Sequence, residues 1–315
     1  MSREPNRVAQ GAERADAPAG ARRHPARKFR EGSFTADDER LAIEEPLEIR
    51  FAGRRFTLTM RTPGHDEELV AGFLLAEGFI EAPGDLGEIR RVRGPRGAPD
   101  PNAVDVILNV PVANLRERLK RNFTISSSCG VCGKTSIDAI QRRVAPIDSR
   151  MTVAAGTILE LAPMMRRAQE IFAATGGLHA AALFVPSPSP ARTNGARKNG
   201  RAEALVTKVK LEVLREDVGR HNAVDKVVGY ALMNGMLPLE TGLMAVSGRL
   251  SFEIVQKAAA AGVPILAAVS APSSLAVELA QEVGITLVGF LRGGTFNLYC
   301  NPERIVPQVS AKLPT

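Results

Sequence analysis

In the second half of the chain, short apolar segments alternate with segments of helical spacing, and this alternation restricts the possible folds most strongly. Strands that alternate with helices are typical of a largely parallel sheet covered by helices. We therefore expect an α/β domain over residues 151–315. The expected helices are 158–175, 222–233, 252–261 and 273–283, and the expected strands are 180–185, 205–214, 243–246, 263–269 and 285–291.

The first half has a different order of elements. Residues 47–51 and 56–60 alternate like a β-hairpin, and 66–77 has acids in its first turn and a glycine just past its end, as helices do. Two further strands are expected at 89–92 and 104–110. We expect a smaller α+β region over residues 35–150.

Positive charge is concentrated in two segments. Of the formal net charge of +7, residues 1–30 carry +5 and residues 187–202 carry +4, so the remainder is slightly acidic. Both segments are rich in Pro, Gly, Ala, Ser and Asn, a composition typical of disorder. We expect a disordered basic arm over residues 1–34, a disordered basic insertion at about 187–202, and no nucleic-acid partner.

Neither a membrane span nor a secretion signal is expected. The longest charge-free run, 258–277, is interrupted by Gly262, Pro264 and Pro272, and the first 20 residues have no apolar core. We expect a cytoplasmic protein. Three cysteines give no disulfide framework, and in a reducing compartment a close pair is more often a metal or redox site.

The close pair is Cys129 and Cys132, in the segment SSSCGVCGK. Glycines make this loop flexible, and an expected helix follows at 135–142. A helix N-terminus and the neighbouring Lys134 favour a thiolate, which is the form that attacks sulfur. The alternative is a pair of buried structural thiols.

A zinc enzyme is a second alternative. His65 and Glu67 form H-x-E upstream of C-x-x-C, which is the residue set of zinc nucleobase deaminases. Ser128 stands where that motif has proline, and a long gap containing expected strands separates the two halves. We expect no metal site.

A third cluster of polar residues is EDVGRHNAVDK, at an expected junction between a strand and a helix. Arg220 is suited to grip a phosphate or carboxylate, and His221 to donate a hydrogen bond or relay a proton. The alternative is that Asp217 or Asn222 caps the helix while Arg220 pairs locally.

Serine-rich turns follow two later strands, and a glycine-rich segment follows the last expected one. Helix starts offer unpaired N–H groups to anions, and ligands of open α/β sheets bind at the carboxyl ends of strands. Although ordinary helix capping explains each serine singly, the three turns together predict one nucleotide-sized site. Cys300, His24 and His179 are interpreted as structural or incidental. The turns contain Ser247, Gly248, Arg249 and Ser251, then Ser270, Ser273 and Ser274, then FLRGGT.

Several long segments together closely resemble the FdhD family, the formate dehydrogenase accessory sulfurtransferases. The resemblance covers about residues 35–305 and omits the basic arm and the insertion. Its segments are SSCGVCGK, TGGLHAAALF, EDVGRHNAVDKVVGYAL, SGRLSFEIVQKAA, GVPILAAVSAPSSLAVELA and GITLVGFLRGGTFNLY.

The resemblance implies a cytidine-deaminase-like sheet used for sulfur delivery. It implies that Cys129 carries a persulfide received from a cysteine desulfurase, with Cys132 as its partner. The sulfur would pass to the molybdenum bis(molybdopterin guanine dinucleotide) cofactor, a bound substrate, for formate dehydrogenase. The family's contact with the guanine dinucleotide falls on Phe290, Leu291, Arg292, Gly293, Gly294 and Thr295.

Three further expectations complete this hypothesis. We assign Arg249, Arg220 and His221 to the charge of the dinucleotide because they lie at expected helix starts. The resemblance also implies a homodimer that meets the desulfurase and the apo formate dehydrogenase, with no permanently bound cofactor. The main alternative is a non-catalytic chaperone that only binds and hands over the molybdenum cofactor, and a zinc hydrolase comes after it.

Overall fold

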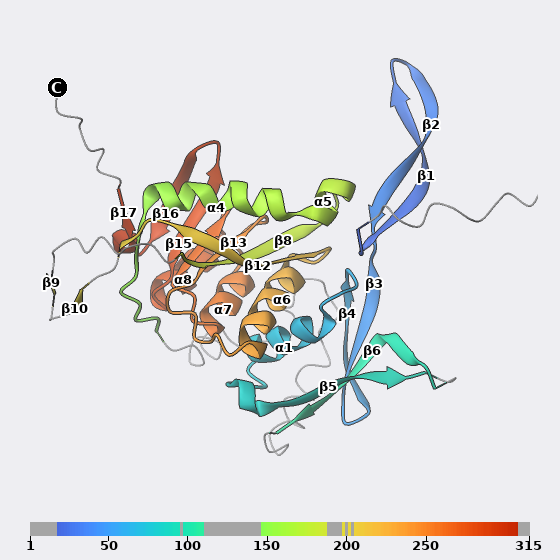
Figure 1. Cartoon of the computed structure of the whole chain (residues 1–315), viewed down its shortest axis with the longest axis horizontal. Helices are drawn as coiled ribbons and strands as arrows, with labels where there is room; N and C mark the ends of the chain where they lie inside the picture. Colours follow the sequence, from blue (N-terminus) through green and yellow to red (C-terminus); the bar gives the residue numbers. More distant parts are fainter. Residues whose placement is uncertain are drawn as a thin grey trace, which may run out of the picture.

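The centre of the molecule is a six-stranded sheet with the strand order β12, β8, β13, β14, β15, β16 (Figure 1). The computed structural model describes residues 18–94, 97–109, 146–187, 197–198, 201–202 and 205–307. The mixed α/β class expected from the sequence is confirmed. The six strands are β8 (His179–Pro186), β12 (Val209–Asp217), β13 (Leu243–Val246), β14 (Ile265–Ala268), β15 (Thr286–Arg292) and β16 (Thr295–Cys300).

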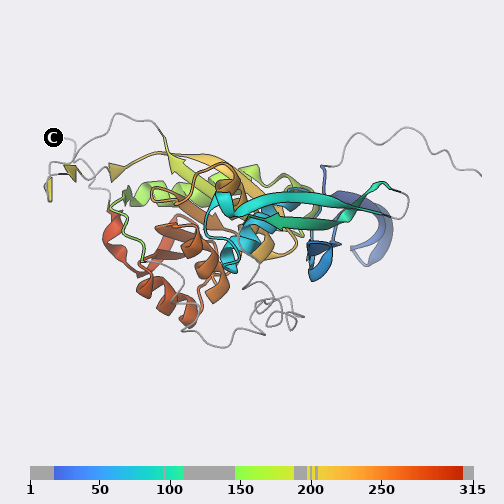
Figure 2. The same ribbon diagram turned by 90° about the horizontal axis from the view of Figure 1, so that it is seen from below.

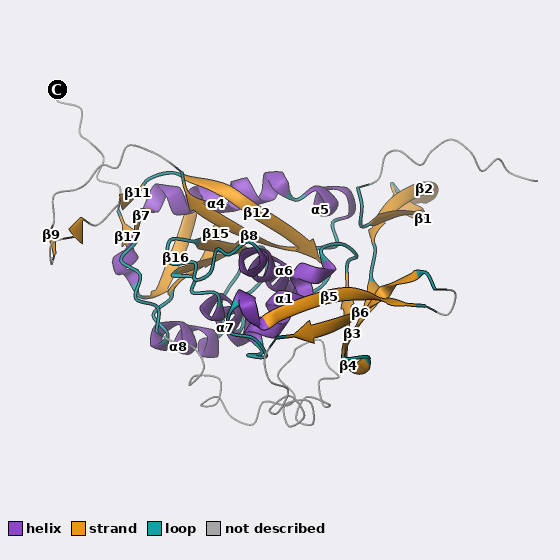
Figure 3. Cartoon of the chain, turned by 60° about the horizontal axis from the view of Figure 1, so that its bottom comes forward, coloured by secondary structure: helices purple, strands orange, loops and turns teal. Residues whose placement is uncertain are grey.

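Helices cover both faces of this sheet (Figures 1 and 3). Successive side chains of a strand point to opposite faces, so each strand supplies two cores. Leu183 and Met244 join the core that contains α6, α7 and α8, whereas Phe184 and Ala245 join the core under α4. The helices are α4 (Ala155–Ala168), α5 (Glu170–Thr175), α6 (Arg220–Met233), α7 (Phe252–Ala260) and α8 (Ser274–Glu282).

The prediction of a largely parallel sheet is wrong. Only the pairs β13–β14 and β14–β15 are parallel, whereas β12–β8, β8–β13 and β15–β16 are antiparallel. A parallel pair needs a long crossover, which α7 and α8 provide, but β15 and β16 are joined by the two residues Gly293 and Gly294. The strand β16 itself was not expected from the sequence.

A second, four-stranded sheet has the order β4, β3, β6, β5. The strands are β3 (Glu45–Phe51), β4 (Arg54–Arg61), β5 (Leu86–Arg93) and β6 (Pro99–Leu108), and α1 (Asp66–Ala76) follows β4. Ile49, Val104 and Val106 are buried in the same core as α1. The expected order of hairpin, helix and two strands is confirmed.

The helices α1 and α6 lie side by side and join the two sheets (Figures 2 and 3). Glycines allow the close approach. A Cβ atom on Gly72 would lie 1.9 Å from the carbonyl oxygen of Asp225, and one on Gly229 would lie 1.8 Å from the carbonyl oxygen of Glu68. The backbones of the two helices are therefore in direct contact.

The prediction that residues 1–34 form a disordered arm is wrong for its last part. β1 (Ala21–Arg30) and β2 (Ser33–Ala42) form an antiparallel hairpin that projects from the body of the protein (Figures 1 and 2). Lys28 pairs with Asp37 at 2.8 Å and with Glu39 at 2.6 Å. The acidic residues of β2 thus offset part of the positive charge of β1. The net charge counted over residues 1–30 does not include these acidic residues.

Smaller elements refine other expectations. The expected helix 158–175 is two helices that meet at Gln169, and part of the expected disordered insertion forms the paired strands β9 (Arg197–Lys198) and β10 (Arg201–Ala202). No helix in the described ranges is long and apolar enough to cross a membrane. The cytidine-deaminase-like character of the sheet stays a prediction. The remaining elements are β7 (Thr152–Ala154), β11 (Leu205–Val206), β17 (Ile305–Val306), η1 (Pro83–Asp85) and η3 (Pro302–Arg304).

The contact between α1 and α6 predicts that Gly72→Ala destabilises the protein. Helix propensity alone would give a gain of about 1 kcal/mol, but the added methyl group meets backbone atoms that cannot move aside. We expect the free energy of unfolding to fall by about 3 kcal/mol, the upper end for overpacking. Chemical denaturation measures it. Gly84→Ala, with no atom within 4 Å of its added carbon, is the control, and equal effects of the two substitutions would contradict the interpretation.

Candidate functional site

One edge of the six-stranded sheet collects the carboxyl ends of four strands. β12 and β13 are both antiparallel to β8, and β14 and β15 are parallel to β13, so these four strands end together where β8 begins. Helices α6, α7 and α8 start at this edge, after Gly219, Ser251 and Ser273. Their unpaired N–H groups and the positive ends of their dipoles therefore face the same side of the molecule.

Backbone hydrogen bonds join the three expected turns, at 247–251, 270–274 and 290–295, into one continuous surface. We call this surface, together with the start of α6, the rim. The N–H of Leu250 donates to Ala271 at 3.1 Å, and the N–H of Ser273 donates to Leu250 at 2.9 Å. The N–H of Phe290 donates to Ser270 at 3.1 Å. The three turns, which the sequence predicted to line one site, are thus in direct contact with one another.

His221 lies at this rim beside a carboxylate. Its Nε2 atom is 2.8 Å from Oε2 of Glu253 and 3.3 Å from Oγ of Ser251. Glu253 is buried, and its other oxygen, Oε1, has no hydrogen-bond partner among the described residues. The carboxylate held against the imidazole fixes the orientation of the ring. Glu253 was not among the residues expected at this site from the sequence.

Arg220 begins α6 next to a second histidine. A Cβ atom on Gly248 would lie 3.5 Å from Nδ1 of His179 and 3.8 Å from Cβ and Cδ of Arg220, so both side chains lie close to this glycine. The Nε atom of Arg220 is buried and has no hydrogen-bond partner within the described part of the chain. A donor left unpaired in this way is available to a bound anion.

His179 was interpreted as incidental, but it lies in this cluster because β8 starts at the same edge. Burial lowers the pKa of His179 below its usual value, and the nearby charges of Arg220, His221 and Arg249 lower it further, against the opposing effect of Asp217. A bound anion would reduce the repulsion among these neighbouring positive charges. The antiparallel direction of β8 was the missing signal, since a parallel strand would have placed His179 at the far edge.

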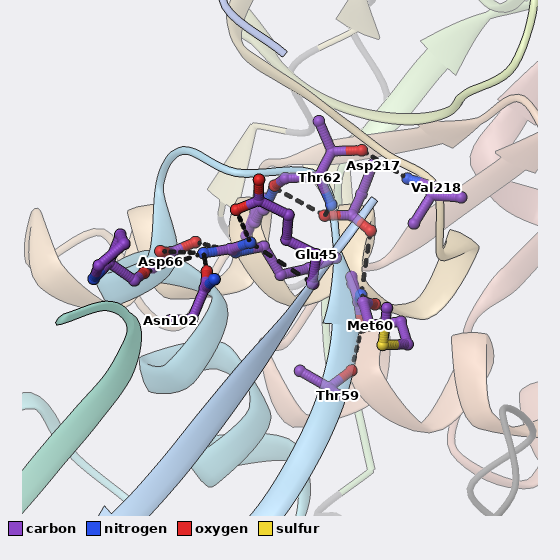
Figure 4. Close-up of polar contacts among 12 residues, drawn as sticks. Glu45, Thr59, Met60, Thr62, Asp66, Asn102, Asp217 and Val218 are labelled. Atoms are coloured by element: carbon purple, nitrogen blue, oxygen red, sulfur yellow. Dashed lines mark hydrogen bonds and ion pairs between the residues drawn. The ribbon is translucent and has the colours of Figure 1, made fainter. Parts of the chain in front are cut away.

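Asp217 sits beneath the start of α6 and is fully buried. It accepts a hydrogen bond from the N–H of Thr62 at 3.1 Å (Figure 4). It accepts another from the N–H of Gly219 at 2.8 Å. It also pairs with Lys226 at 2.7 Å and accepts from the amide of Asn222 at 3.0 Å. These contacts set the position from which Arg220 and His221 project. The alternative that Asp217 or Asn222 caps the helix is wrong, because the N-cap residue of α6 is Gly219 and this helix start has no side-chain capping hydrogen bond.

The glycine-rich segment FLRGGT is a hairpin tip and not the loop after a last strand. Phe290, Leu291 and Arg292 end β15, Gly293 and Gly294 form the turn with φ of 60° and 74°, and Thr295 begins β16. The side chain of Leu291 is buried in the core under α4, so only its backbone can meet a ligand. The guanidinium of Arg292 lies 5.4 Å from the centre of the Phe290 ring.

The expected nucleophiles, Cys129 and Cys132, lie outside the described residues, as does the expected helix 135–142. Cys300 is buried, and its thiol donates to the carbonyl oxygen of Ile285 at 3.3 Å. Burial raises the pKa of Cys300, which keeps it in the unreactive thiol form.

The H-x-E residues begin α1. His65 lies 3.6 Å from Glu68 and Glu67 is exposed. Burial would raise the pKa of Glu68, but hydrogen bonds from Arg215 and His65 lower it to about 2. Within the described ranges, no group of three or more His, Cys, Asp or Glu side chains is placed to hold a metal ion.

Comparison with known proteins identifies the family of this chain. Residues 42–194 and 195–306 match the model of the FdhD/NarQ family. The chain belongs to the FdhD/NarQ family.

Similar relatives span nearly the whole chain. A protein of Mycolicibacterium paratuberculosis named Sulfur carrier protein FdhD is 48% identical over 278 residues, which cover 87% of this chain and 94% of the relative. The protein of the same name from Streptomyces coelicolor is 45% identical and covers 88% of this chain and 93% of its own length. The resemblance inferred from the sequence motifs is confirmed.

A solved structure shows a similar fold. It is the crystal structure of a candidate formate dehydrogenase accessory protein from Desulfotalea psychrophila, with a TM-score of 0.65 and 27% sequence identity. The match covers 91% of this chain and 99% of that one. The arrangement of sheets and helices is therefore similar to that of the Desulfotalea psychrophila protein.

The rim predicts that Arg220→Gln raises the pKa of His179. The guanidinium disfavours protonation of the ring, so its removal makes protonation easier. Titration followed by nuclear magnetic resonance of the imidazole nitrogens measures the pKa in both proteins. Arg150→Gln, on an exposed segment, is the control and should leave the pKa of His179 unchanged.

The lowered pKa of His179 also makes the stability of the fold depend on pH. A depressed histidine pKa means that the unfolded chain binds more protons, so stability falls as the pH drops through the unfolded value near 6.5. Arg220→Gln should weaken this dependence. If the pKa of His179 were unchanged in that variant, the charge of Arg220 would not act on His179.

Proposed function

We propose that this protein is a sulfur carrier for the maturation of formate dehydrogenase. In this proposal it accepts sulfur from a cysteine desulfurase as a persulfide on Cys129. It passes the sulfur in the cytoplasm to the molybdenum bis(molybdopterin guanine dinucleotide) cofactor of the apo formate dehydrogenase. The match to the FdhD/NarQ family and to relatives named Sulfur carrier protein FdhD supports the proposal most directly.

Loading of sulfur needs no net oxidation. The Cys129 thiolate attacks the terminal sulfur of the desulfurase persulfide and forms a new S–S bond. The S–S bond of the donor breaks at the same time, and the donor cysteine leaves as a thiolate. The terminal sulfur has then moved from one cysteine to another.

Delivery uses the second cysteine. Cys132 attacks the inner sulfur of the Cys129 persulfide, so that a Cys129–Cys132 disulfide forms and the terminal sulfur leaves as hydrosulfide, which becomes a ligand of molybdenum. The two electrons that reduce this sulfur to sulfide come from the two cysteines. A cellular dithiol then reduces the disulfide before the next cycle.

The rim supports the dinucleotide part of the proposal. Arg220, His221 and Arg249 would neutralise phosphates at the starts of α6 and α7, and the unpaired Nε of Arg220 would donate to one of them. The imidazole of His179 adds a further hydrogen-bonding group. The backbone of the hairpin tip 290–295 would meet the guanine edge. We also propose that the carrier works as a homodimer.

The carrier hypothesis predicts that Cys129→Ala abolishes sulfur loading and formate dehydrogenase activation while the protein stays folded. Incubation with a cysteine desulfurase and cysteine, followed by intact mass measurement, should add about one sulfur atom to the wild type and none to the variant, and a reductant should remove it. Cys132→Ala should still accept sulfur but deliver it poorly. Cys300→Ala is the control because that thiol is buried and should leave loading unchanged.

The outcomes separate the carrier from its alternatives. A Cys129→Ala protein that activates formate dehydrogenase fully would exclude this residue as the carrier and favour a chaperone that only hands over the cofactor. Loss of loading in Cys132→Ala alone would exchange the two roles. One zinc ion per chain by elemental analysis would support the zinc hydrolase.

The dinucleotide part of the proposal predicts that guanosine diphosphate binds more tightly than adenosine diphosphate. Helix starts take phosphates of any nucleotide, so they supply affinity without choosing a base. The choice must come from the backbone groups at the hairpin tip, which can complement the donors and acceptors of guanine. Calorimetric titration compares the two affinities, and equal values would contradict this site.

Two variants separate the residues that bind the phosphates from those that select guanine. Arg249→Ala should weaken both diphosphates alike, because it faces the charge that they share. Gly293→Asn keeps the positive φ of 60°, which asparagine tolerates, but adds a side chain at the tip. It should reduce the preference for guanine. A preference unchanged by Gly293→Asn would place the guanine contact elsewhere.

A further inference from the structure

Arginines gather in a cavity on the four-stranded sheet, separate from the residues of the rim. The cavity has a volume of about 300 Å³ and one acidic lining residue, Asp105. Its volume is at the lower end of the range for small-molecule pockets. The lining residues are Arg50, Gly53, Arg90, Arg91, Val92, Arg93 and Asp105.

Strand register sets the centre of this cavity. Arg50 of β3 is paired with Asp105 of β6, and Asp105 is paired with Arg90 of β5. Paired residues of neighbouring strands project to the same face, so these three side chains form a row across the sheet. Ile49 and Val104 alternate with them and face the core under α1 on the other side. The charged row therefore lies on the face of the sheet that points away from this core.

The guanidinium groups are oriented by contacts with fixed groups. Arg90 donates to Asp105 at 3.2 Å, and the N–H of Gly53 donates to the other oxygen of Asp105 at 2.8 Å. Arg91 donates to buried Asp66 at 2.6 Å, and Arg93 donates to the carbonyl oxygen of Gly97 at 3.3 Å. An oriented guanidinium loses less entropy when it binds a ligand.

Donors remain in excess after these contacts. Each guanidinium carries five N–H groups. Arg50 uses its Nε toward Glu48, and Arg90 uses one terminal nitrogen, so among the described residues their other nitrogens have no partner. The lining residues alone carry a net charge of +3, and two of the four arginines also pair with carboxylates outside the lining, Arg50 with Glu48 and Arg91 with Asp66. A surplus of oriented, forked donors matches the oxygens of phosphate groups.

We propose that this cavity binds a compact polyanion that carries phosphate groups. Val92 is the one apolar side chain of the lining, and the lining contains no aromatic ring on which a base could stack. Recognition therefore rests on charge and on hydrogen bonds to the phosphate oxygens. The site does not depend on the proposed sulfur transfer, because it shares no residue with the cysteines or with the rim.

Inorganic pyrophosphate is the probe for this site. We expect it to bind the full chain in calorimetric titration at about 0.15 M salt, where the field of scattered surface charges is largely screened beyond about 8 Å. Arg50→Gln and Arg90→Gln should each weaken this binding at least tenfold. The control is Arg54→Gln on the same hairpin, an exposed arginine outside the cavity lining, which should change the affinity less than twofold.

Hydrogen exchange locates the bound pyrophosphate. We expect protection of the Gly53 amide and of β5, with the melting temperature of each variant confirming that it is folded. Absence of binding by the wild type at about 10 mM pyrophosphate would overturn the proposal, as would equal losses in Arg54→Gln and Arg90→Gln. Protection confined to the helix starts at 247–251 and 270–274 would also overturn it, since the ligand would then occupy the rim.

Discussion

The buried carboxylate of Asp217 is the contact on which the arrangement of both sheets depends. It ends β12, and through Thr62, Gly219, Asn222 and Lys226 it holds the end of β4 against the first turn of α6. The ammonium of Lys226 also donates to the carbonyl oxygen of Thr62 at 2.9 Å, which closes the cluster. Removal of one partner of such a buried pair would leave an uncompensated charge, at a cost of about 3–5 kcal/mol. The position of Arg220 and His221 is thus a property of the core.

Contacts beside this cluster connect segments that are far apart in the sequence. Arg61, which ends β4 and is almost completely buried, donates to Asp66 and to Asn102, and so ties β4 to α1 and β6 (Figure 4). On the other side of α6, Asp225 pairs with Lys257 of α7 at 2.7 Å. A buried ion pair therefore links α6 to α7 and another links α1 to β4, while apolar side chains of all three helices share one core.

Local patterns in the sequence predicted the elements well but not their directions. Strand 243–246 and helix 252–261 follow from hydrophobic spacing and capping residues, which are local. The direction of β8 is set by its pairing with β12 and β13, for which no short segment carries a signal, and so His179 was missed. Glu253 was missed because one acid in the first turn of a helix is ordinary. The hairpin of β1 and β2 was missed because its charge balance joins residues on two strands.

The direction of β8 also decides where the chain can change length. β8 begins at the rim with His179 and leaves the sheet at Pro186, which is paired with Val209 at the opposite edge. The connection between these two residues, which contains the basic insertion, therefore departs and returns on the side away from the helix starts. A change in the length of this connection would therefore fall at the end of the sheet away from the groups of the rim.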